Sequence, residues 1–148
     1  MRPAWSQPGR SSSTVSAALQ KISVISLFVE DLPTTKAFYS DVFGLPFAYE
    51  DESSAVVQFE NMMINLLKVE EASSLVEPLE VAAAGAGSRF QISVWVDDVD
   101  AVCVQLTKKG VTLLTEPRDR EWGMRTATFA DPAGNSWEVA QGIGGGEG

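Results

Sequence analysis

The sequence predicts an α+β protein built from two modules that share one order of elements, a strand, a helix and three further strands. Two sets of matches indicate this repeat. Val29-Glu30-Asp31-Leu32 is matched by Val96-Asp97-Asp98-Val99, and Gly44-Leu45 is matched by Gly110-Val111 at nearly the same offset. Two matches in the same order favour an internal duplication over chance similarity between two ordinary strand–helix junctions.

The first module is predicted to span residues 21–69. Residues 22–29 are apolar and rich in β-branched side chains, which is typical of a strand. Asp31 or a neighbour then caps a helix whose first turn tolerates Pro33, and Gly44 ends that helix in a left-handed conformation. Three short strands are predicted to follow, at residues 47–50, 55–60 and 63–69.

Residues 70–88 differ in character and are predicted to be a linker with one helical turn. They contain Pro78, three consecutive alanines, Gly85 and Gly87, and this composition disfavours a long regular element.

The second module is predicted to span residues 89–141. It opens with a strand at 90–96, and Asp97-Asp98 precedes a helix that Gly110 closes. Strands are then predicted at 111–115, 125–130 and 136–140. The last two are joined by Asp131-Pro132-Ala133-Gly134-Asn135, which has turn-forming residues throughout.

The two ends of the chain are predicted to be flexible. Residues 1–20 hold two arginines and five serines without an apolar core, so they form a leader rather than a secretory signal. Residues 142–148 are mostly glycine and form a tail.

Composition excludes several classes of function. None of the 148 residues is histidine, which removes Ser-His-Asp and Cys-His triads and histidine-based zinc sites. A net charge of −9 without a basic run argues against binding to nucleic acid or an anionic membrane. The single cysteine, Cys103, cannot form an internal disulfide, so we expect a cytoplasmic protein with Cys103 in the core of the second helix. No apolar run approaches the ~18 residues of a membrane helix.

Several segments together resemble the vicinal oxygen chelate superfamily, which includes glyoxalase I, bleomycin-resistance proteins and extradiol dioxygenases. The resemblance covers residues 21–141 in the expected order. The segments that carry it are Phe28-Val29-Glu30-Asp31-Leu32, Ala37-Phe38-Tyr39-Ser40-Asp41-Val42-Phe43-Gly44-Leu45, Val94-Trp95-Val96-Asp97-Asp98-Val99-Asp100-Ala101, Trp122-Gly123-Met124-Arg125 and Phe129-Ala130-Asp131-Pro132-Ala133-Gly134-Asn135-Ser136-Trp137-Glu138.

The resemblance implies a glyoxalase-like fold of two βαβββ modules, whose curled mixed sheets form a cleft for a metal or a small ligand. It also implies a homodimer. Each sheet is expected to have one face covered by its helix, so Phe38, Tyr39 and Phe43 are expected in the core.

The resemblance also indicates where metal ligands would stand. Motif by motif, the four positions fall on Val24, Asn65, Gln91 and Glu138. Only Glu138 is a strong ligand, because valine supplies no donor and the two amides are neutral. No metal cofactor is therefore expected. If a divalent metal binds weakly, Glu138 and Gln91 are its predicted ligands.

The same strands offer residues for a metal-free ligand site. Gln91, Ser93 and Trp95 are spaced by two, which places them on one sheet face. Either that face lines a cleft, or it packs Trp95 and Ser93 against the helix. The predicted ligand-binding residues are Asn65, Gln91, Ser93, Trp95, Trp122, Arg125, Thr128 and Glu138.

Three of these residues have alternatives that the sequence leaves open. Trp122 either covers a ligand or anchors a loop on the sheet edge. Arg125 either holds a ligand carboxylate, pairs with Glu138, or ends a solvated strand. Glu138 either acts as a catalytic base or serves as a recognition or pairing residue, while Trp137, the next residue to it, should face the helices.

The first hypothesis for function is a homodimer that binds a small organic ligand without a catalytic metal, as in antibiotic sequestration. The acidic composition favours a cationic ligand. The alternative is a lyase, isomerase or dioxygenase of the same superfamily that uses Glu138, and a third hypothesis is an accessory module that only dimerises.

Overall fold

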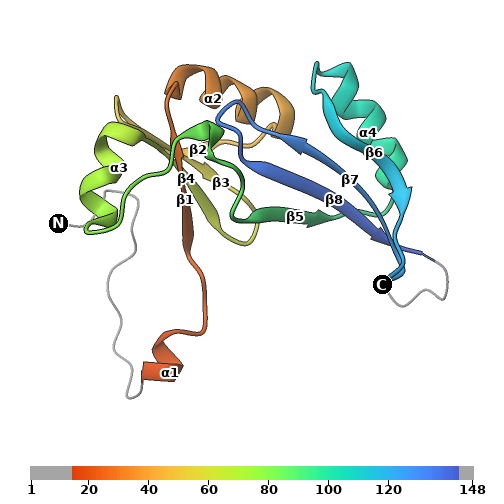
Figure 1. The fold of residues 1–148 in the computed structure, drawn as a ribbon, viewed down its shortest axis with the longest axis horizontal. Helices are drawn as coiled ribbons and strands as arrows, with labels where there is room; N and C mark the ends of the chain where they lie inside the picture. The colour runs from red at the N-terminus through yellow and green to blue at the C-terminus, as the bar shows by residue number, and fades with distance from the viewer. Residues whose placement is uncertain (1–14, 144–148) are drawn as a thin grey trace. The chain divides into compact units, whose positions relative to one another are not determined.

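The computed structural model describes residues 15–143, and its internal contacts divide the chain into two units, Met1–Val81 and Ala82–Gly148 (Figure 1). Among the described residues, no helix is long and apolar enough to cross a membrane.

The first unit contains a four-stranded mixed sheet with one helix on its face. Strand β1 runs parallel to β4, while β4, β3 and β2 pair antiparallel, which gives the order β1-β4-β3-β2. The strands are β1 (Val24–Val29), β2 (Phe47–Glu50), β3 (Ser54–Gln58) and β4 (Met63–Lys68).

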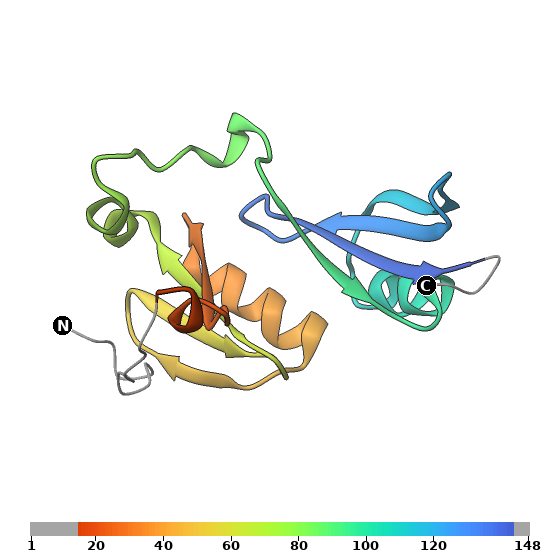
Figure 2. The same ribbon diagram turned by 90° about the horizontal axis from the view of Figure 1, so that it is seen from below.

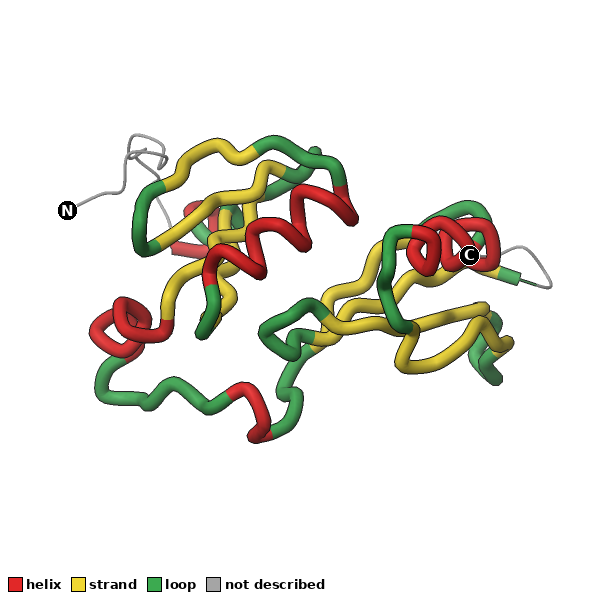
Figure 3. The backbone as a smooth tube through the Cα atoms, turned by 90° about the horizontal axis from the view of Figure 1, so that it is seen from above, coloured by secondary structure: helices red, strands yellow, loops and turns green. Residues whose placement is uncertain are grey.

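The first helix starts and ends where the sequence predicts. Helix α2 (Leu32–Phe38) continues directly into the π-helix η1 (Tyr39–Phe43) and packs against β3 and β4 (Figure 3). The side chain of Asp31 caps α2 by accepting the Thr34 amide hydrogen, and this hydrogen bond lowers the pKa of Asp31. Gly44 adopts a φ of 66°, the left-handed conformation that ends the helix.

The core of this unit lies between the sheet and that helix. Tyr39 is fully buried, as the sequence predicts, and stacks on Phe43, which also contacts Phe38. Phe38 and Phe43 are only half-buried. Leu27 of β1 and Leu66 of β4 are buried and paired in register on the same side. We call the opposite side of each sheet its open face.

The second unit repeats the arrangement of the first. Its strands pair in the order β5-β8-β7-β6, again with one parallel pair, and helix α4 (Val99–Lys108) packs against β6, β7 and β8 (Figure 2). The predicted duplication of the βαβββ module is therefore confirmed. The strands are β5 (Gln91–Trp95), β6 (Leu113–Asp119), β7 (Met124–Ala130) and β8 (Ser136–Gly142).

Helix α4 is fixed by its cap and by its apolar face. The Asp98 side chain accepts the Ala101 amide hydrogen, and the Gln141 side chain of β8 accepts that of Val99. Cys103 and Leu106 are buried beneath the helix. Burial raises the pKa of the Cys103 thiol, which suits the predicted role of Cys103 as core filler.

The predicted linker holds more structure than one helical turn. Helix α3 (Val69–Val76) occupies its first part and a 3-10 turn η2 (Ala84–Ala86) its second. Helix α3 forms because it packs against β1 and β4 and buries Ala72, a tertiary contact that local composition does not reveal.

The edge strand β6 is longer than the sequence predicts. It runs to Asp119 through Pro117, which usually ends a strand. The pairing with β7 shifts register between Thr115 and Arg118, so the strand is irregular there and accommodates the proline.

The chain ends are only partly described. A short helix α1 (Val15–Ala18) lies within the predicted leader, and Gly142 of the predicted tail belongs to β8. The rest of both predictions, residues 1–14 and 144–148, lies outside the described residues.

Candidate functional site

The open face of the second sheet carries the row of residues that the sequence predicts. Gln91, Ser93 and Trp95 are exposed, whereas Ile92 and Val94 between them are partly buried toward the helix. The Trp95 side chain remains 75% exposed. The alternative in which Trp95 packs against the helix is therefore wrong.

Glu138 stands beside this row on β8. Ser93 lies opposite it in register, and the Ser93 hydroxyl donates to Glu138 Oε1 at 2.7 Å. The Glu138 Oε2 atom has no hydrogen-bond partner within residues 15–143, so it is available as an acceptor. In parallel, Gln91 Nε2 donates to the Ser136 hydroxyl at 3.0 Å.

Two lines of side chains cross this open face. Thr128 lies opposite Glu138, and its hydroxyl is 2.8 Å from that of Thr115 on β6, which extends the polar line from β5 to β6. The neighbouring line contains Trp95, Ala140 and Thr126, in adjacent register positions. Ala140 and Thr126 are almost completely covered by their neighbours, so the accessible side chain of this line is that of Trp95.

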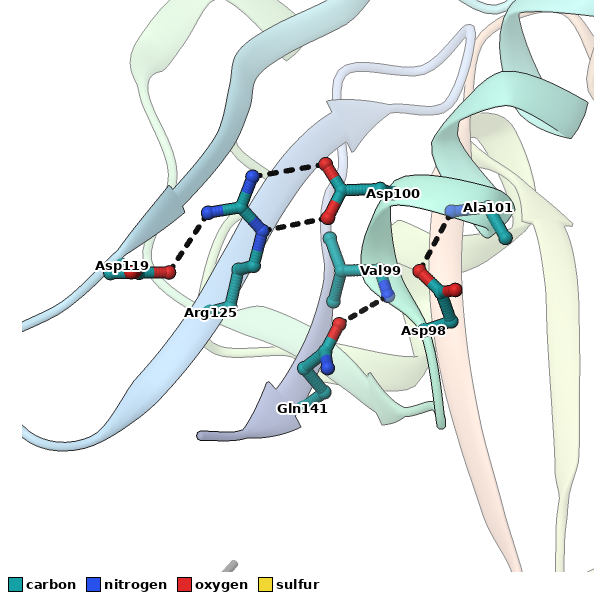
Figure 4. A network of polar contacts seen from close by, with 7 residues as sticks. All are labelled: Asp98, Val99, Asp100, Ala101, Asp119, Arg125 and Gln141. Atoms are coloured by element: carbon teal, nitrogen blue, oxygen red, sulfur yellow. Dashed lines mark hydrogen bonds and ion pairs between the residues drawn. The ribbon is translucent and has the colours of Figure 1, made fainter. Parts of the chain in front are cut away.

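Arg125 does not belong to this face. Its guanidinium binds both carboxylate oxygens of Asp100 on α4, at 2.7 and 3.0 Å, and Asp119 at 2.8 Å (Figure 4). Of the alternatives for Arg125, pairing with Glu138 is wrong, because Arg125 is the residue next to Thr126 on β7 and therefore points to the opposite, helix side of the sheet. The pKa of Asp100 is lowered by its hydrogen bonds from Arg125, whose own pKa is raised by Asp100 and Asp119.

Trp122 lies in the turn between β6 and β7 with 68% of its side chain exposed. The Arg120 guanidinium carbon is 5.6 Å from the centre of its ring, and Arg120 Nε donates to the Thr126 hydroxyl at 2.9 Å. Sequence reasoning missed Arg120. The signal was the turn itself, because Gly123 with φ of 84° folds residue 120 back onto Met124, whose carbonyl accepts the Arg120 amide hydrogen.

Asn65 lies on the side of the first sheet opposite α2, where Val56 and Leu67 are also buried. It is 6% exposed, and its Nδ2 donates to the Ser26 hydroxyl at 3.2 Å, while its Oδ1 is buried without a partner among the described residues. Ser26 and Asn65 pair between the first and fourth strands of their unit, as Ser93 and Glu138 do in theirs. Val24 lies two residues before Ser26 and offers no donor.

The residues present do not fit a tightly bound divalent metal. Residues 15–143 contain no group of three or more cysteine, aspartate or glutamate side chains placed to hold one. In the second unit, Glu138 is accompanied by Gln91, which contributes a neutral amide. One carboxylate and one amide fall short of the three protein ligands that catalytic metal sites generally need.

Comparison with known proteins agrees with this architecture. A curated protein of Bacillus subtilis (strain 168), the uncharacterized protein YraH, is 34% identical over 123 residues, which are 80% of this chain and 96% of that protein. A crystal structure of a glyoxalase/bleomycin resistance protein/dioxygenase from Nocardioides superposes with a TM-score of 0.79 at 20% identity, over 90% of this chain and 89% of that one. The crystal structure of lactoylglutathione lyase from Agrobacterium tumefaciens superposes with a TM-score of 0.66 at 27% identity, over 83% of this chain and 94% of that one.

The sequence profile of one superfamily matches residues 21–139, which covers both modules and the segment between them. Together with the duplicated βαβββ fold, this match establishes the family. The chain belongs to the glyoxalase/bleomycin resistance protein/dioxygenase superfamily.

Proposed function

We propose that the protein binds a small organic molecule on the open face of its second sheet and does so without a catalytic metal. The observation that carries this proposal is the exposed row of Gln91, Ser93 and Trp95 beside Glu138. An aromatic plate next to a few fixed polar groups is the usual composition of a small-molecule site.

Each part of the row has a distinct task in this proposal. Trp95 offers a large flat surface for stacking. Glu138 is oriented by the Ser93 hydroxyl, which leaves Oε2 to accept a hydrogen bond from a ligand hydroxyl or ammonium group. Glu138 therefore serves recognition in this proposal, because its hydrogen-bond partner is the Ser93 hydroxyl and no second acidic side chain contacts it among residues 15–143.

The biological use that we propose is sequestration of a cationic antibiotic. The net charge of −9 favours approach of a cation, and the unpaired Glu138 oxygen gives it a specific partner. Superfamily membership supports a small-molecule ligand of this general kind.

A panel of amine-bearing antibiotics tests this proposal by thermal shift and tryptophan fluorescence. We expect at least one compound to stabilise the wild-type protein, and Trp95→Ala and Glu138→Gln each to weaken its binding by about tenfold. Leu75→Ala is the matched control, since it removes an exposed apolar side chain from α3 in the other unit. Binding that survives both substitutions would exclude this face as the site.

A metal-dependent lyase is the second candidate, favoured by the 27% identity to lactoylglutathione lyase. In that case Glu138 and Gln91 would be the metal ligands of the second unit. Elemental analysis of the purified protein distinguishes the two candidates. About one tightly held divalent metal per chain would support the lyase, whereas a metal-free protein that still binds its ligand would support the first proposal.

A further inference from the structure

We propose that Arg120 binds a carboxylate of the ligand and that Trp122 stacks on the planar group that bears it. This inference rests on the proposed function, because Arg120 lies at the β6 side of the same open face. It assigns a ligand class, planar organic acids that also carry a hydrogen-bond donor.

Arg120 is held in place by two contacts that leave its binding edge open. The Nε atom donates to the Thr126 hydroxyl, and the guanidinium lies over the Trp122 ring. The two terminal nitrogens, Nη1 and Nη2, have no partner among residues 15–143. A fixed guanidinium with both terminal nitrogens open is arranged to bind a carboxylate with two hydrogen bonds.

The acidic side chains nearby do not neutralise this arginine. Asp119 precedes it in sequence, but the Asp119 carboxylate is bound by Arg125 on the helix side of the sheet. Arg118 pairs in register with Thr126 and is exposed on the same open face as Arg120, so it adds a second positive charge. Neither arginine forms an ion pair among residues 15–143, and the exposed Glu121 of the adjoining turn forms none with them, so both guanidinium groups are available to an anion.

The rest of the open face defines what else the ligand carries. Thr126 lies on the line that also holds Trp95 and Ala140, and Glu138 lies on the next line, two residues or ~7 Å along the strands. A ligand whose carboxylate binds Arg120 would need a donor group that reaches Glu138 Oε2 across this separation. The predicted preference for a purely cationic ligand is thereby revised to a ligand with both kinds of group.

Nuclear magnetic resonance on the full chain tests this inference with two probes, benzoate and benzamide, which share a ring and differ in charge. The arginine Nε–H and tryptophan indole N–H signals are assigned through Arg120→Lys and Trp122→Phe. We expect benzoate to shift the Arg120 and Trp122 signals saturably, and benzamide to bind at least about tenfold more weakly.

Matched variants separate binding from folding. Arg120→Lys keeps the charge but loses the paired donors, so it should weaken benzoate binding about tenfold or more. Arg89→Lys, in the exposed loop before β5, should leave it unchanged. Thr126→Val should weaken it through loss of the hydroxyl that positions Arg120, whereas Thr126→Ser should retain it. Circular dichroism and urea unfolding confirm that each variant is folded.

Two results would overturn the inference. If benzoate and benzamide shift Trp95 and Trp122 equally, the open face still binds organic molecules and only the carboxylate assignment fails. If benzoate binds Arg120→Lys as tightly as wild type, or if it shifts neither the Arg120 Nε–H signal nor the tryptophan signals of the wild type, Arg120 is not a carboxylate site. The antibiotic panel then tests the proposed function independently.

Discussion

Asn65 retains a buried polar atom at an energetic cost. Its amide makes one hydrogen bond to Ser26 and leaves Oδ1 without a partner among the described residues. If the amide is turned over, the nitrogen is left unpartnered instead, so the cost does not depend on that assignment. A buried polar atom without a partner costs about 1–3 kcal/mol.

Asn65→Leu should therefore increase the free energy of unfolding by about 1 kcal/mol, because leucine has a similar size and needs no hydrogen-bond partner. Ser26 is exposed, so its hydroxyl can form a hydrogen bond with water instead. Urea unfolding measures the change. Asn135→Leu is the control, since Asn135 donates to the Asp131 carboxylate at 3.0 Å and its replacement should destabilise the protein. A loss of stability in Asn65→Leu would contradict this reading of Asn65.

The sequence predicts the sheet face of some site residues correctly and that of others wrongly. Gln91, Ser93 and Trp95 are assigned correctly because β5 is a regular strand in which alternate residues share a face. Arg125 is assigned wrongly although β7 pairs regularly with β8, because alternation alone places residues 125 and 128 on opposite faces. Arg120 was missed because it follows β6, whose register shifts depend on pairing between strands. Alternation within one strand does not specify that pairing.

At the scale of elements, Arg125 ties helix α4 to its sheet. It joins Asp100 at the start of the helix to Asp119 at the end of β6 (Figure 4). The sequence shows α4 and its cap but not this contact, because the residues come together only after the sheet forms. The same reason explains why the packed helix α3 was predicted as a linker.

Asp100→Asn should destabilise the protein at neutral pH, and the difference from wild type should vanish in acid. The pKa of Asp100 is lowered in the folded protein, so its stabilising effect is complete above the unfolded value of about 3.9. The effect is lost as the pH falls below that value and through the folded pKa. Urea unfolding of wild type and variant at neutral pH and in acid measures the difference.

Asp97→Asn provides the control for that prediction, since Asp97 is exposed and has the same charge. The free energy of unfolding of Asp97→Asn should equal that of the wild type at neutral pH. If the free energies of unfolding of wild type and Asp100→Asn differ by the same amount at neutral pH and in strong acid, the Arg125 contact does not couple folding to protonation of Asp100.

For the whole molecule, the duplication is the feature that the sequence predicts best. Both sheets have the order first, fourth, third, second strand, and both helices start at an aspartate cap. The two copies then differ in their polar pairs, since Ser26 meets a neutral amide and Ser93 meets a carboxylate. One fold repeated twice thus carries two chemically different polar pairs at corresponding positions, with a buried amide in the first unit and a partly exposed carboxylate in the second.

The homodimer that the resemblance implies remains a prediction at this scale. The second unit leaves large apolar side chains exposed, among them Trp95, Leu114 and Trp122. We expect light scattering at micromolar concentration to give about twice the chain mass of 15.9 kDa. A mass of one chain under those conditions would show that the protein is a monomer.

The central claim is that a small organic ligand binds at Trp95 on the open face of the second sheet. Fluorine resonance of the protein labelled with 5-fluorotryptophan tests it most directly, with signals assigned by single Trp→Phe variants. A compound that stabilises the protein should move the signal of the exposed Trp95 and leave that of Trp137, buried on the helix side, nearly unchanged. Stabilisation without movement of the Trp95 signal would contradict the claim.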